Sequence, residues 1–273
     1  MKLSVPVSAL VVVAALVGNA RAQTLSFADY GDALKTYVND RGMVNYAGLK
    51  AHNEKLDAFL KSIANLDHKT YGGWKDTERI AFWLNAYNAC TLKAIIDHYP
   101  IKSSFLTSLH YPKNSIRQIS GVWDDLKFTI MGRPMVLDGI EHNVLRTNYH
   151  EPRIHMALVC AAMGCPPLRN EPYTSERLSA QFDDQARRFL SNPAKFRIDR
   201  DAGRVYLSSI FKWFGDDFIP KYAVEDSYGN HSKKERATLH FVAGYLEKKD
   251  ADYLASGNYD VKYLDYDWSL NEQ

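Results

Sequence analysis

Residues 78–99, ERIAFWLNAYNACTLKAIIDHY, limit the possible folds of this chain more than any other segment. Apolar side chains occur on nearly every side of a helix drawn through this segment, so none of its faces suits water. The pattern predicts a central helix that other elements enclose. Its polar exceptions, Asn85 and Asn88, stand three positions apart and share one face. Buried amides need hydrogen-bond partners, so this pair is expected to hold a neighbouring loop or to line a site.

The remaining elements divide between the two parts of the chain. Apolar spacing or helix-starting residues predict helices over residues 26–39, 49–66, 138–146, 174–190 and 233–246. Two hairpins are predicted, one from residues 127–131 and 135–137, the other from 195–200 and 204–207. The apolar run 154–160 predicts a central strand covered on both faces. We therefore expect one α+β domain over residues 23–273, with a helical N-terminal part packed on a mostly antiparallel sheet.

Residues 1–22 have the layout of a secretory signal peptide. Lys2 precedes an apolar run, and small residues at Ala20 and Ala22 fit a cleavage site before Gln23. The apolar run is shorter than the roughly 20 residues that a membrane span needs. We expect this segment to be removed, which leaves an exported protein, periplasmic or secreted, without a membrane span.

The charge pattern excludes one large class of partner. The net charge is +2, with both signs mixed along the sequence and no basic cluster. Nucleic acid is therefore not an expected partner, whereas a small molecule or a peptide is. The sequence has no glycine-rich phosphate loop, no His-Glu-x-x-His and no Gly-x-Ser-x-Gly motif, so it predicts no cofactor.

We expect any chemistry in residues 153–168, RIHMALVCAAMGCPPL. This segment holds two of the three cysteines, Cys160 and Cys165, whereas Cys90 lies inside the apolar helix and is expected in the core. An odd number of cysteines in an exported chain leaves at least one free thiol. A cysteine hydrolase or acyl transferase needs a thiolate, an imidazole close to it and a group that orients the imidazole.

His142 is the histidine that the spacing favours as a base. Asp138 and Arg146 lie four positions to either side of it on one helical face, so an acid that can orient the ring is local. His155 and Cys160 are an odd number of positions apart, which puts them on opposite faces of a strand. His155 is therefore expected to face away from the thiol.

Simpler interpretations compete with catalysis at several of these positions. A histidine at a helix start is often a packing residue, and Glu141 has the spacing of a capping-box carboxylate that follows Asp138. Asn85 and Asn88 can brace structure without touching a substrate. A cysteine that ends an apolar strand, as Cys160 does here, is often part of the core.

Other chemistries of the cysteine pair remain open at this point. Cys160 and Cys165 could form a redox-active or structural disulfide that closes a tight loop. The two thiols with His142 and His155 could supply a zinc set, although the opposite faces of the strand count against it. The aromatic segment around Trp213 fits core packing, or else the binding of a sugar or peptide.

Six blocks of the sequence together resemble the domain-of-unknown-function family numbered 547, which is found in bacteria and plants. They lie at residues 82–89, 116–119, 137–146, 155–167, 207–213 and 264–268. The resemblance covers nearly all of the mature chain but implies no activity, because the family is named for lacking one. It implies that the family's signature positions are occupied by Asn85, Tyr87, Asn88, Glu141, His142, Arg146 and Cys160. Cys165 is less typical, since the plant-like version of this loop tends to lack it.

Two hypotheses of different class follow. The first is an exported cysteine-dependent hydrolase or acyl transferase acting on a peptide, amide or ester. Its nucleophile is Cys160 or Cys165 and its base is His142, which Asp138 or Glu141 orients. Its substrate contacts are drawn from Asn85, Tyr87, Asn88 and Arg146.

The order of these residues is unusual for such an enzyme. A buried helix ahead of a sheet is similar to the papain and transglutaminase folds, but in those folds the nucleophile precedes the histidine. In this chain the histidine comes first. The second hypothesis is a non-catalytic exported binding or interaction module, and thiol redox chemistry at Cys160 and Cys165 is a further alternative.

Overall fold

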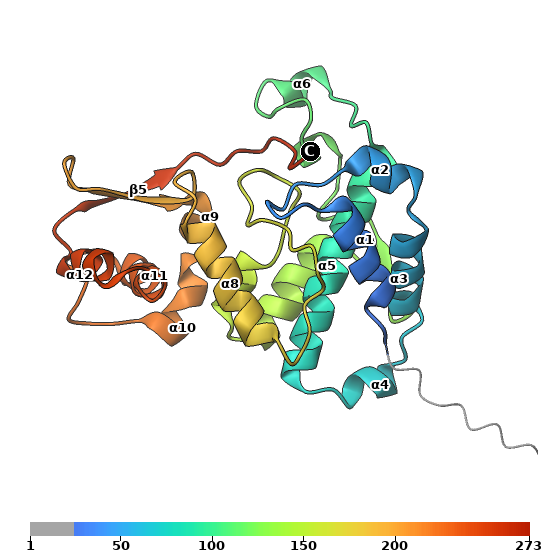
Figure 1. The fold of residues 1–273 in the computed structure, drawn as a ribbon, viewed down its shortest axis with the longest axis horizontal. Coiled ribbons are helices and arrows are strands. Elements are labelled where there is room, and N and C mark those ends of the chain that lie inside the picture. The colour runs from blue at the N-terminus through green and yellow to red at the C-terminus, as the bar shows by residue number, and fades with distance from the viewer. Residues whose placement is uncertain (1–24) are drawn as a thin grey trace, which may run out of the picture.

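The predicted central helix is present as α5, Asp76–His98, in a computed structural model that describes residues 25–273. Four helices lie around it on one side of the molecule in Figure 1, namely α1 (Ala28–Tyr37), α2 (Tyr46–Ala51), α3 (Glu54–Ala64) and α4 (His68–Gly72). The predicted signal peptide, residues 1–22, lies outside the described residues. The single α+β domain predicted from the sequence is confirmed.

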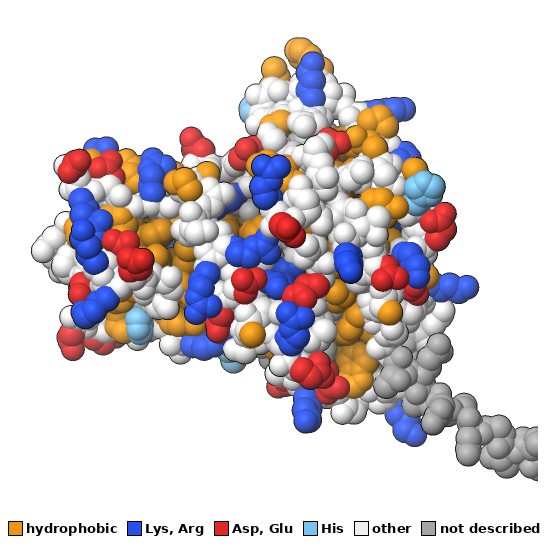
Figure 2. Space-filling model, in the orientation of Figure 1, with side chains coloured by type: hydrophobic (Ala, Val, Ile, Leu, Met, Phe, Trp, Pro, Cys, Tyr) orange, Lys and Arg blue, Asp and Glu red, His pale blue; other side chains and the backbone are white. Residues whose placement is uncertain are grey.

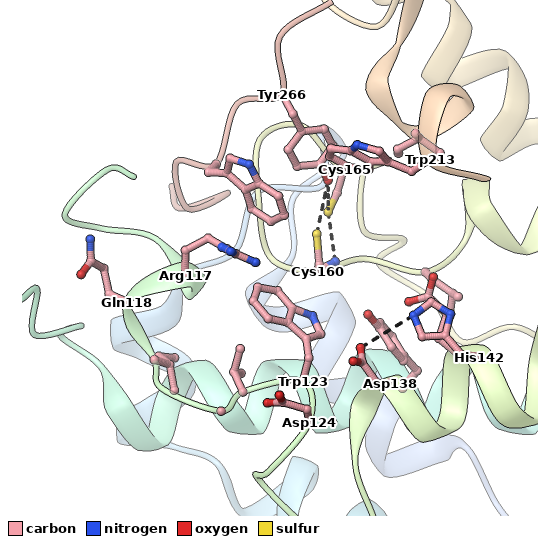
Figure 3. Close-up of a pocket in the computed structure, with 18 of the residues that line it drawn as sticks. Arg117, Gln118, Trp123, Asp124, Asp138, His142, Cys160, Cys165, Trp213 and Tyr266 are labelled. Carbon is pink, nitrogen blue, oxygen red and sulfur yellow. Dashed lines mark hydrogen bonds and ion pairs between the residues drawn. The ribbon is translucent and has the colours of Figure 1, made fainter. Parts of the chain in front are cut away.

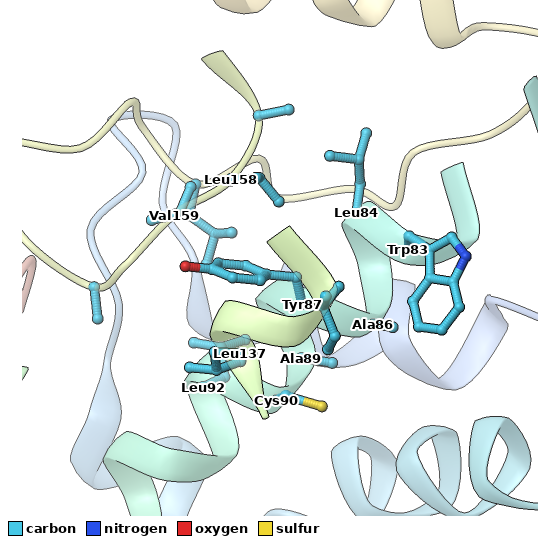
Figure 4. Packing of buried hydrophobic residues seen from close by; sticks show 14 of the residues in the cluster. Trp83, Leu84, Ala86, Tyr87, Ala89, Cys90, Leu92, Leu137, Leu158 and Val159 are labelled. Carbon is cyan, nitrogen blue, oxygen red and sulfur yellow. The ribbon is translucent and has the colours of Figure 1, made fainter. Parts of the chain in front are cut away.

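Helix α5 is enclosed because apolar side chains cover nearly its whole circumference, so that no side of it is suited to contact with water. Every residue from 80 to 92 is buried, including the two asparagines. Figure 4 shows Tyr87 and Ala89 of this helix packed among Leu137, Leu158 and Val159, which come from later segments. Burying each large apolar side chain is worth about 1.5–3 kcal/mol. This helix therefore fixes the loops that cross it, and one of those loops carries the cysteine pair.

A second hydrophobic cluster forms around a three-stranded sheet with the order β3-β4-β5. The strands are β3 (Phe196–Asp199), β4 (Arg204–Ser208) and β5 (Asp260–Leu264), and β4 pairs antiparallel with β3 and parallel with β5. The β3–β4 hairpin confirms the sequence prediction. The accompanying helices are α8 (Leu178–Leu190), α9 (Ser209–Phe214), η4 (Gly215–Phe218), α10 (Ile219–Tyr222), α11 (Lys233–Ala243) and α12 (Lys248–Ser256).

Short elements connect the two clusters. The other predicted hairpin is present as β1 (Phe128–Ile130) and β2 (Arg133–Met135), which pair antiparallel. The remaining elements are α6 (Phe105–Ser108), the 3₁₀ turn η1 (Ile116–Gln118), the π-helical η2 (Gly139–Leu145), α7 (Arg146–Asn148) and the 3₁₀ turn η3 (Pro152–Met156). Segments η2 and η3 flank the cavity that holds the candidate site.

The C-terminal tail, residues 265–273, ties the two parts together. It leaves β5 and crosses back to the helical side, where the chain ends beside α2 (Figure 1). On the way its backbone pairs with the cysteine loop: the Met163 and Gly164 amides donate to the Ser269 and Asp267 carbonyls, and the Asn271 amide donates to the Ala161 carbonyl. The tail thereby holds the loop on the side away from α5.

The predicted strand over residues 154–160 is wrong. Residues 152–156 form the 3₁₀ turn η3, Ala157 continues the turn, and residues 158–160 belong to no strand. The run is apolar because it passes between the two hydrophobic clusters: Ile154 and Val159 pack in one, and Met156 packs in the other. Its backbone bonds to the Asn88 side chain instead of to a neighbouring strand. The Asn88 amide donates to the Ala157 carbonyl and accepts from the Val159 N–H.

Two helix predictions also need correction. The helix expected over residues 49–66 is two helices, because the chain breaks at His52 and Asn53 between α2 and α3. The capping box expected at Asp138 and Glu141 is absent, since Asp138 has helical backbone angles and caps nothing with its side chain. Residues 139–145 wind as a wider π-helix, and Glu141 instead contacts Tyr87 of α5.

The face drawn in Figure 2 carries acidic and basic side chains side by side, with neither sign forming a continuous patch. Such a surface fits the net charge of +2. Among residues 25–273, we find no helix with the length and apolar character needed to cross a membrane.

Candidate active site

A cavity of about 790 Å³ opens beside the cysteine loop. It brings together most of the residues that the sequence singles out: Tyr87, Asp138, Glu141, His142, Cys160 and Cys165. Aromatic residues of α9 and the tail complete its wall, namely Trp213, Phe214, Tyr266 and Trp268. Asn85, Asn88 and Arg146 lie outside its lining.

The two thiols lie together in this cavity, beneath Tyr266 and between Arg117 and His142 (Figure 3). Cys165 Sγ accepts a hydrogen bond from the backbone N–H of Cys160 at 3.0 Å. The Tyr266 hydroxyl is 3.0 Å from Cys165 Sγ and 3.3 Å from Cys160 Sγ. The chain reverses at Ala161, whose φ of 58° is in the left-handed region, and this reversal folds Cys165 back onto the Cys160 amide.

These contacts make Cys165 the more acidic of the two thiols. Burial alone would raise the pKa of Cys165, but hydrogen bonds from the Cys160 thiol, the Tyr266 hydroxyl and the loop backbone bring that pKa to about 7. The pKa of Cys160 is raised well above its ordinary value, first because its thiol bonds to Cys165 and second by burial. The thiolate therefore forms on Cys165. Burial raises the pKa of Cys90, which stays a core thiol.

The asparagines of α5 brace the backbone that carries these thiols. Asn88 Nδ2 donates to the Ala157 carbonyl at 3.0 Å, and its Oδ1 accepts from the Val159 amide at 2.9 Å. Asn85 does the same for both backbone groups of Tyr173, at 2.8 and 2.9 Å. Both side-chain amides are thus engaged by backbone. Asn88 positions the cysteine loop and Asn85 positions the chain ahead of α8, so the bracing interpretation fits their contacts.

Tyr266 reaches the sulfurs because residue 164 is glycine. A β-carbon at Gly164 would stand 2.6 Å from the Tyr266 ring, closer than real contacts allow. The Gly164 amide also donates to the Asp267 carbonyl at 2.7 Å, which fixes the tail over the loop. The small residue therefore lets the aromatic ring press against the loop and place its hydroxyl between the two thiols.

His142 is held by Arg146. The Arg146 guanidinium donates to His142 Nδ1 at 2.9 Å, so this nitrogen carries no proton. The proton is then on Nε2, which lies 3.8 Å from Asp138 Oδ1. Burial and then the Arg146 charge lower the pKa of His142. The ring is neutral at pH 7, and its one basic nitrogen accepts from the Arg146 guanidinium. The hydrogen-bond partners of the sulfurs are the Tyr266 hydroxyl and the loop backbone, not this ring.

Asp217 of η4, which the sequence did not suggest, joins the two histidines. It accepts two hydrogen bonds from Arg146, at 2.6 and 2.8 Å, and one from His155 Nε2 at 2.8 Å. His155 is buried and stacks on Phe214 at 4.3 Å between ring centroids. The strand that was expected to put His155 on the face opposite Cys160 does not form, and His155 lines the thiol cavity. Its Nε2 nevertheless bonds to Asp217 and not to a thiol.

Glu141 is a carboxyl group of this cavity whose protonation, like that of Cys165, changes near neutral pH. Burial raises the pKa of Glu141 to about 7, against a hydrogen bond from the Tyr87 hydroxyl and the charge of Arg146, which lower it. A carboxyl group with such a pKa is present in both forms at pH 7 and can give or take a proton. Tyr87 supports it from α5 and is itself buried.

The raised pKa of Glu141 makes a prediction about stability. The folded protein binds this proton up to about pH 7, whereas the unfolded chain releases it near pH 4.5. Stability is therefore lost as pH rises between these values, because the folded state must then hold a partly buried charge. We expect the free energy of unfolding of Glu141→Gln, minus that of the unmodified protein, to rise by about 2 kcal/mol from pH 5 to pH 8. Urea unfolding at each pH measures this difference.

Exposed Glu176 on the turn before α8 provides the control for this measurement. Glu176→Gln should leave the pH dependence of unfolding as it is in the unmodified protein. If Glu141→Gln and the unmodified protein keep a constant difference in unfolding free energy from pH 5 to pH 8, the carboxyl does not have the raised pKa.

An aromatic wall extends from Tyr266, which contacts the thiols, along the cavity. Trp213 is 45% exposed, and its ring centroid lies 4.8 Å from that of Tyr266 and 6.1 Å from that of Trp268. Arg117 lies over the faces of Trp123 and Trp268, each at 5.2 Å. Core packing therefore does not account for Trp213. This wall presents flat apolar surface to whatever occupies the cavity.

Sequence reasoning missed the residues that come from far along the chain. Tyr266 stood in one of the family-like blocks, and its place in that block was the signal that could have linked it to the thiols. Asp217 follows the aromatic segment of α9 and has no motif that marks it. Within the part of the chain that the structure describes, no group of three or more His, Cys, Asp or Glu side chains is arranged to hold a metal ion.

Comparison with known proteins places this site in a family. Residues 71–190 match the family model described as "Protein of unknown function, DUF547". The matched region includes α5, η2 and the cysteine loop, whereas Tyr266 and Asp217 lie beyond it. No curated protein and no solved structure matches the chain.

Proposed function

For this chain, residues 71–190 of which match the DUF547 family model, we propose a thiol-dependent acyl-transfer enzyme, a hydrolase or acyl transferase acting on an amide, ester or peptide. The observation that carries the proposal is the environment of Cys165 Sγ. It accepts a backbone N–H at 3.0 Å and lies 3.0 Å from a tyrosine hydroxyl, in the wall of a large cavity. Groups that stabilise a sulfur anion are what a cysteine nucleophile needs.

The proposed reaction begins with the Cys165 thiolate. Its sulfur attacks the carbonyl carbon of the substrate, forming a C–S bond and placing the negative charge on the carbonyl oxygen. The bond to the leaving group then breaks, and the leaving group takes a proton from the neutral form of Glu141. Water or another acceptor attacks the thioester, gives its proton to the Glu141 carboxylate and releases the Cys165 thiolate.

Several neighbours serve this chemistry by position. Asn88 holds the loop, and Tyr266 covers the sulfur on the side of the tail. His142 lies in the cavity wall, with its Nε2 3.8 Å from Asp138 Oδ1. In this proposal it has a positioning role and does not take the proton of the thiol. A separate base for the thiol is unnecessary, because the pKa of Cys165 is about 7.

The experiment that tests the proposal is capture of the thioester. The protein is mixed with a panel of activated aryl esters and thioesters, quenched in acid and mapped by mass spectrometry. We expect an acyl adduct on Cys165 that hydroxylamine releases, and none with Cys165→Ser. An adduct on Cys160 in the unmodified protein would move the nucleophile to the other thiol. Absence of any adduct across the panel, with the thiols intact, would exclude the acyl-transfer proposal.

The Tyr266 hydroxyl, which lies 3.3 Å from Cys160 Sγ and 3.0 Å from Cys165 Sγ, brings both sulfurs to one point and supports a second candidate, dithiol exchange. Both cysteines are free, and their thiols bond to each other. In such an exchange the Cys165 thiolate attacks a substrate disulfide, forms a mixed disulfide and releases the first substrate thiol. Cys160 then attacks Cys165 Sγ, forms a Cys160–Cys165 disulfide and releases the second substrate thiol, so the pair loses two electrons and two protons that the substrate gains. Cys160→Ser separates the candidates, because exchange needs both thiols whereas acyl transfer needs only Cys165.

A further inference from the structure

A second cavity reaches Cys165 from another side of the cysteine loop. It has a volume of about 330 Å³ and lies between residues 40–43, the loop at 162–167 and the end of α8. Cys165 and Pro166 line both cavities. The sulfur that we place at the centre of the chemistry is therefore close to two separate spaces, and the second has a different character from the aromatic one.

Lys195 gives the second cavity a buried positive charge. The residue is only 7% exposed, and its ammonium donates one hydrogen bond, to the Met163 carbonyl. An ammonium carries three N–H donors. Over residues 25–273, no carboxylate lies within ion-pair distance of Lys195. The negative charges that act on it are those of Cys165 and Asp267, and neither group forms an ion pair or hydrogen bond with the ammonium in this part of the chain. A buried cation without a directly bonded counter-charge is costly, so this site favours an anion beside it.

Two arginines add to this charge. Arg188 donates to the Asp40 backbone carbonyl and to Gln185 Oε1, and Arg41 is exposed. In the described part of the chain neither guanidinium forms an ion pair with a carboxylate. The acidic side chain in the lining is Asp40, whose Oδ1 accepts from Asn170 at 3.0 Å. Three cations thus line this cavity with the Asp40 carboxylate and the Cys165 thiolate, and the cavity keeps a net positive charge.

We propose that this second cavity binds an anionic group, a carboxylate or a phosphate, of the molecule that reacts at Cys165. The binding groups are the Lys195 ammonium and the Arg188 guanidinium, both beside the cysteine loop. The role in the reaction rests on the acyl transfer proposed above, whereas anion binding itself does not. The substrate class would then be acyl donors or acceptors that carry a negative charge close to the reacting carbonyl.

A pair of alkylating agents tests the position of this charge directly. Iodoacetate and iodoacetamide modify the same thiolate, but only iodoacetate carries a carboxylate, so the ratio of their rates at Cys165 is independent of the fraction of thiolate. We expect Lys195→Met to lower the iodoacetate-to-iodoacetamide ratio about tenfold. Lys61→Met, at an exposed position of α3, should leave the ratio unchanged.

Competition by free anions tests the same site in the unmodified protein. Inorganic phosphate or acetate should slow iodoacetate more than iodoacetamide, and whichever of the two anions competes at lower concentration identifies a phosphate or a carboxylate site. At ten times its Kd, the bound anion should also raise the Tm by about 2–4 °C, and Arg188→Gln should reduce the rise. Chloride at equal ionic strength is the control.

The outcomes separate this inference from the proposed function. Equal ratios in the unmodified protein and Lys195→Met, together with no anion-specific rise in Tm, would overturn the anion site even if a thioester forms on Cys165. A Lys195-dependent rise in Tm with phosphate or acetate supports the anion site even if no acyl adduct is ever captured, and in that case only the acyl-transfer proposal falls.

Discussion

Replacing Cys165 with serine is expected to reduce alkylation of the protein by iodoacetamide at pH 7.5 by at least about tenfold. Alkylation needs the thiolate, and the hydrogen bonds around Cys165 bring its pKa to about 7, so most of this thiol is ionised at that pH. The thiols left in the variant are Cys160, whose pKa is raised well above its ordinary value, and Cys90, whose pKa burial raises. Stopped-flow labelling with mass mapping measures the loss.

The matched variant is Cys160→Ser. It removes the thiol that bonds to Cys165 but keeps the Cys160 backbone N–H and the Tyr266 hydroxyl on the sulfur. Labelling should persist at Cys165, with a midpoint in the pH profile above 7 but below that of an ordinary thiol, and Tyr266→Phe should raise the midpoint further. If Cys160→Ser abolishes labelling and Cys165→Ser does not, the thiolate is on Cys160, and Cys160 is the more acidic thiol of the pair.

The position of the cysteine pair could be predicted from the sequence, but its surroundings could not. Residues 78–99 predicted a buried helix, and α5 confirms it; the sequence left open whether its two asparagines hold a loop or line a site, and their amides bond to backbone. This part succeeded because burial and the need to satisfy amides are local consequences of composition. The run 154–160 failed, because an apolar stretch enclosed by two clusters has the same composition as a central strand. Because that strand is absent, strand alternation no longer separates His155 from the thiols.

The contacts that set the chemistry of the site span long distances in the chain. Tyr266 lies about a hundred positions from the thiols, and Asp217 lies 71 positions from Arg146. Such pairs depend on where the C-terminal tail and η4 pack, which hydrophobic periodicity does not determine. The local pattern around His142 gave Asp138 and Arg146 as neighbours, but the guanidinium, not the carboxylate, takes the basic nitrogen of the ring.

Asp217→Ala is expected to destabilise the protein by about 2–3 kcal/mol at pH 7, which is less than the loss of a fully buried ion pair because both partners keep some contact with water. The side chains of Arg146 and Asp217 are 28% and 25% exposed. Partial burial would raise the pKa of Asp217, but hydrogen bonds from Arg146 and His155 hold it well below its ordinary range. Urea unfolding measures the loss, and the adjacent Asp216→Ala, with a side chain 71% exposed, is the control.

The dependence of this loss on pH and on Arg146 shows whether the ion pair causes it. Because the folded pKa of Asp217 is depressed, its stabilisation is present above the unfolded value of 3.8 and is lost as pH falls below that value. The difference between Asp217→Ala and the unmodified protein should therefore shrink below about pH 4. Arg146→Met combined with Asp217→Ala should cost less than the sum of the two single changes, because the double variant leaves no unpaired charge beside His155. Additive losses that stay constant down to pH 3 would mean that Asp217 stabilises η4 by packing, and that His142 and His155 are positioned independently of it.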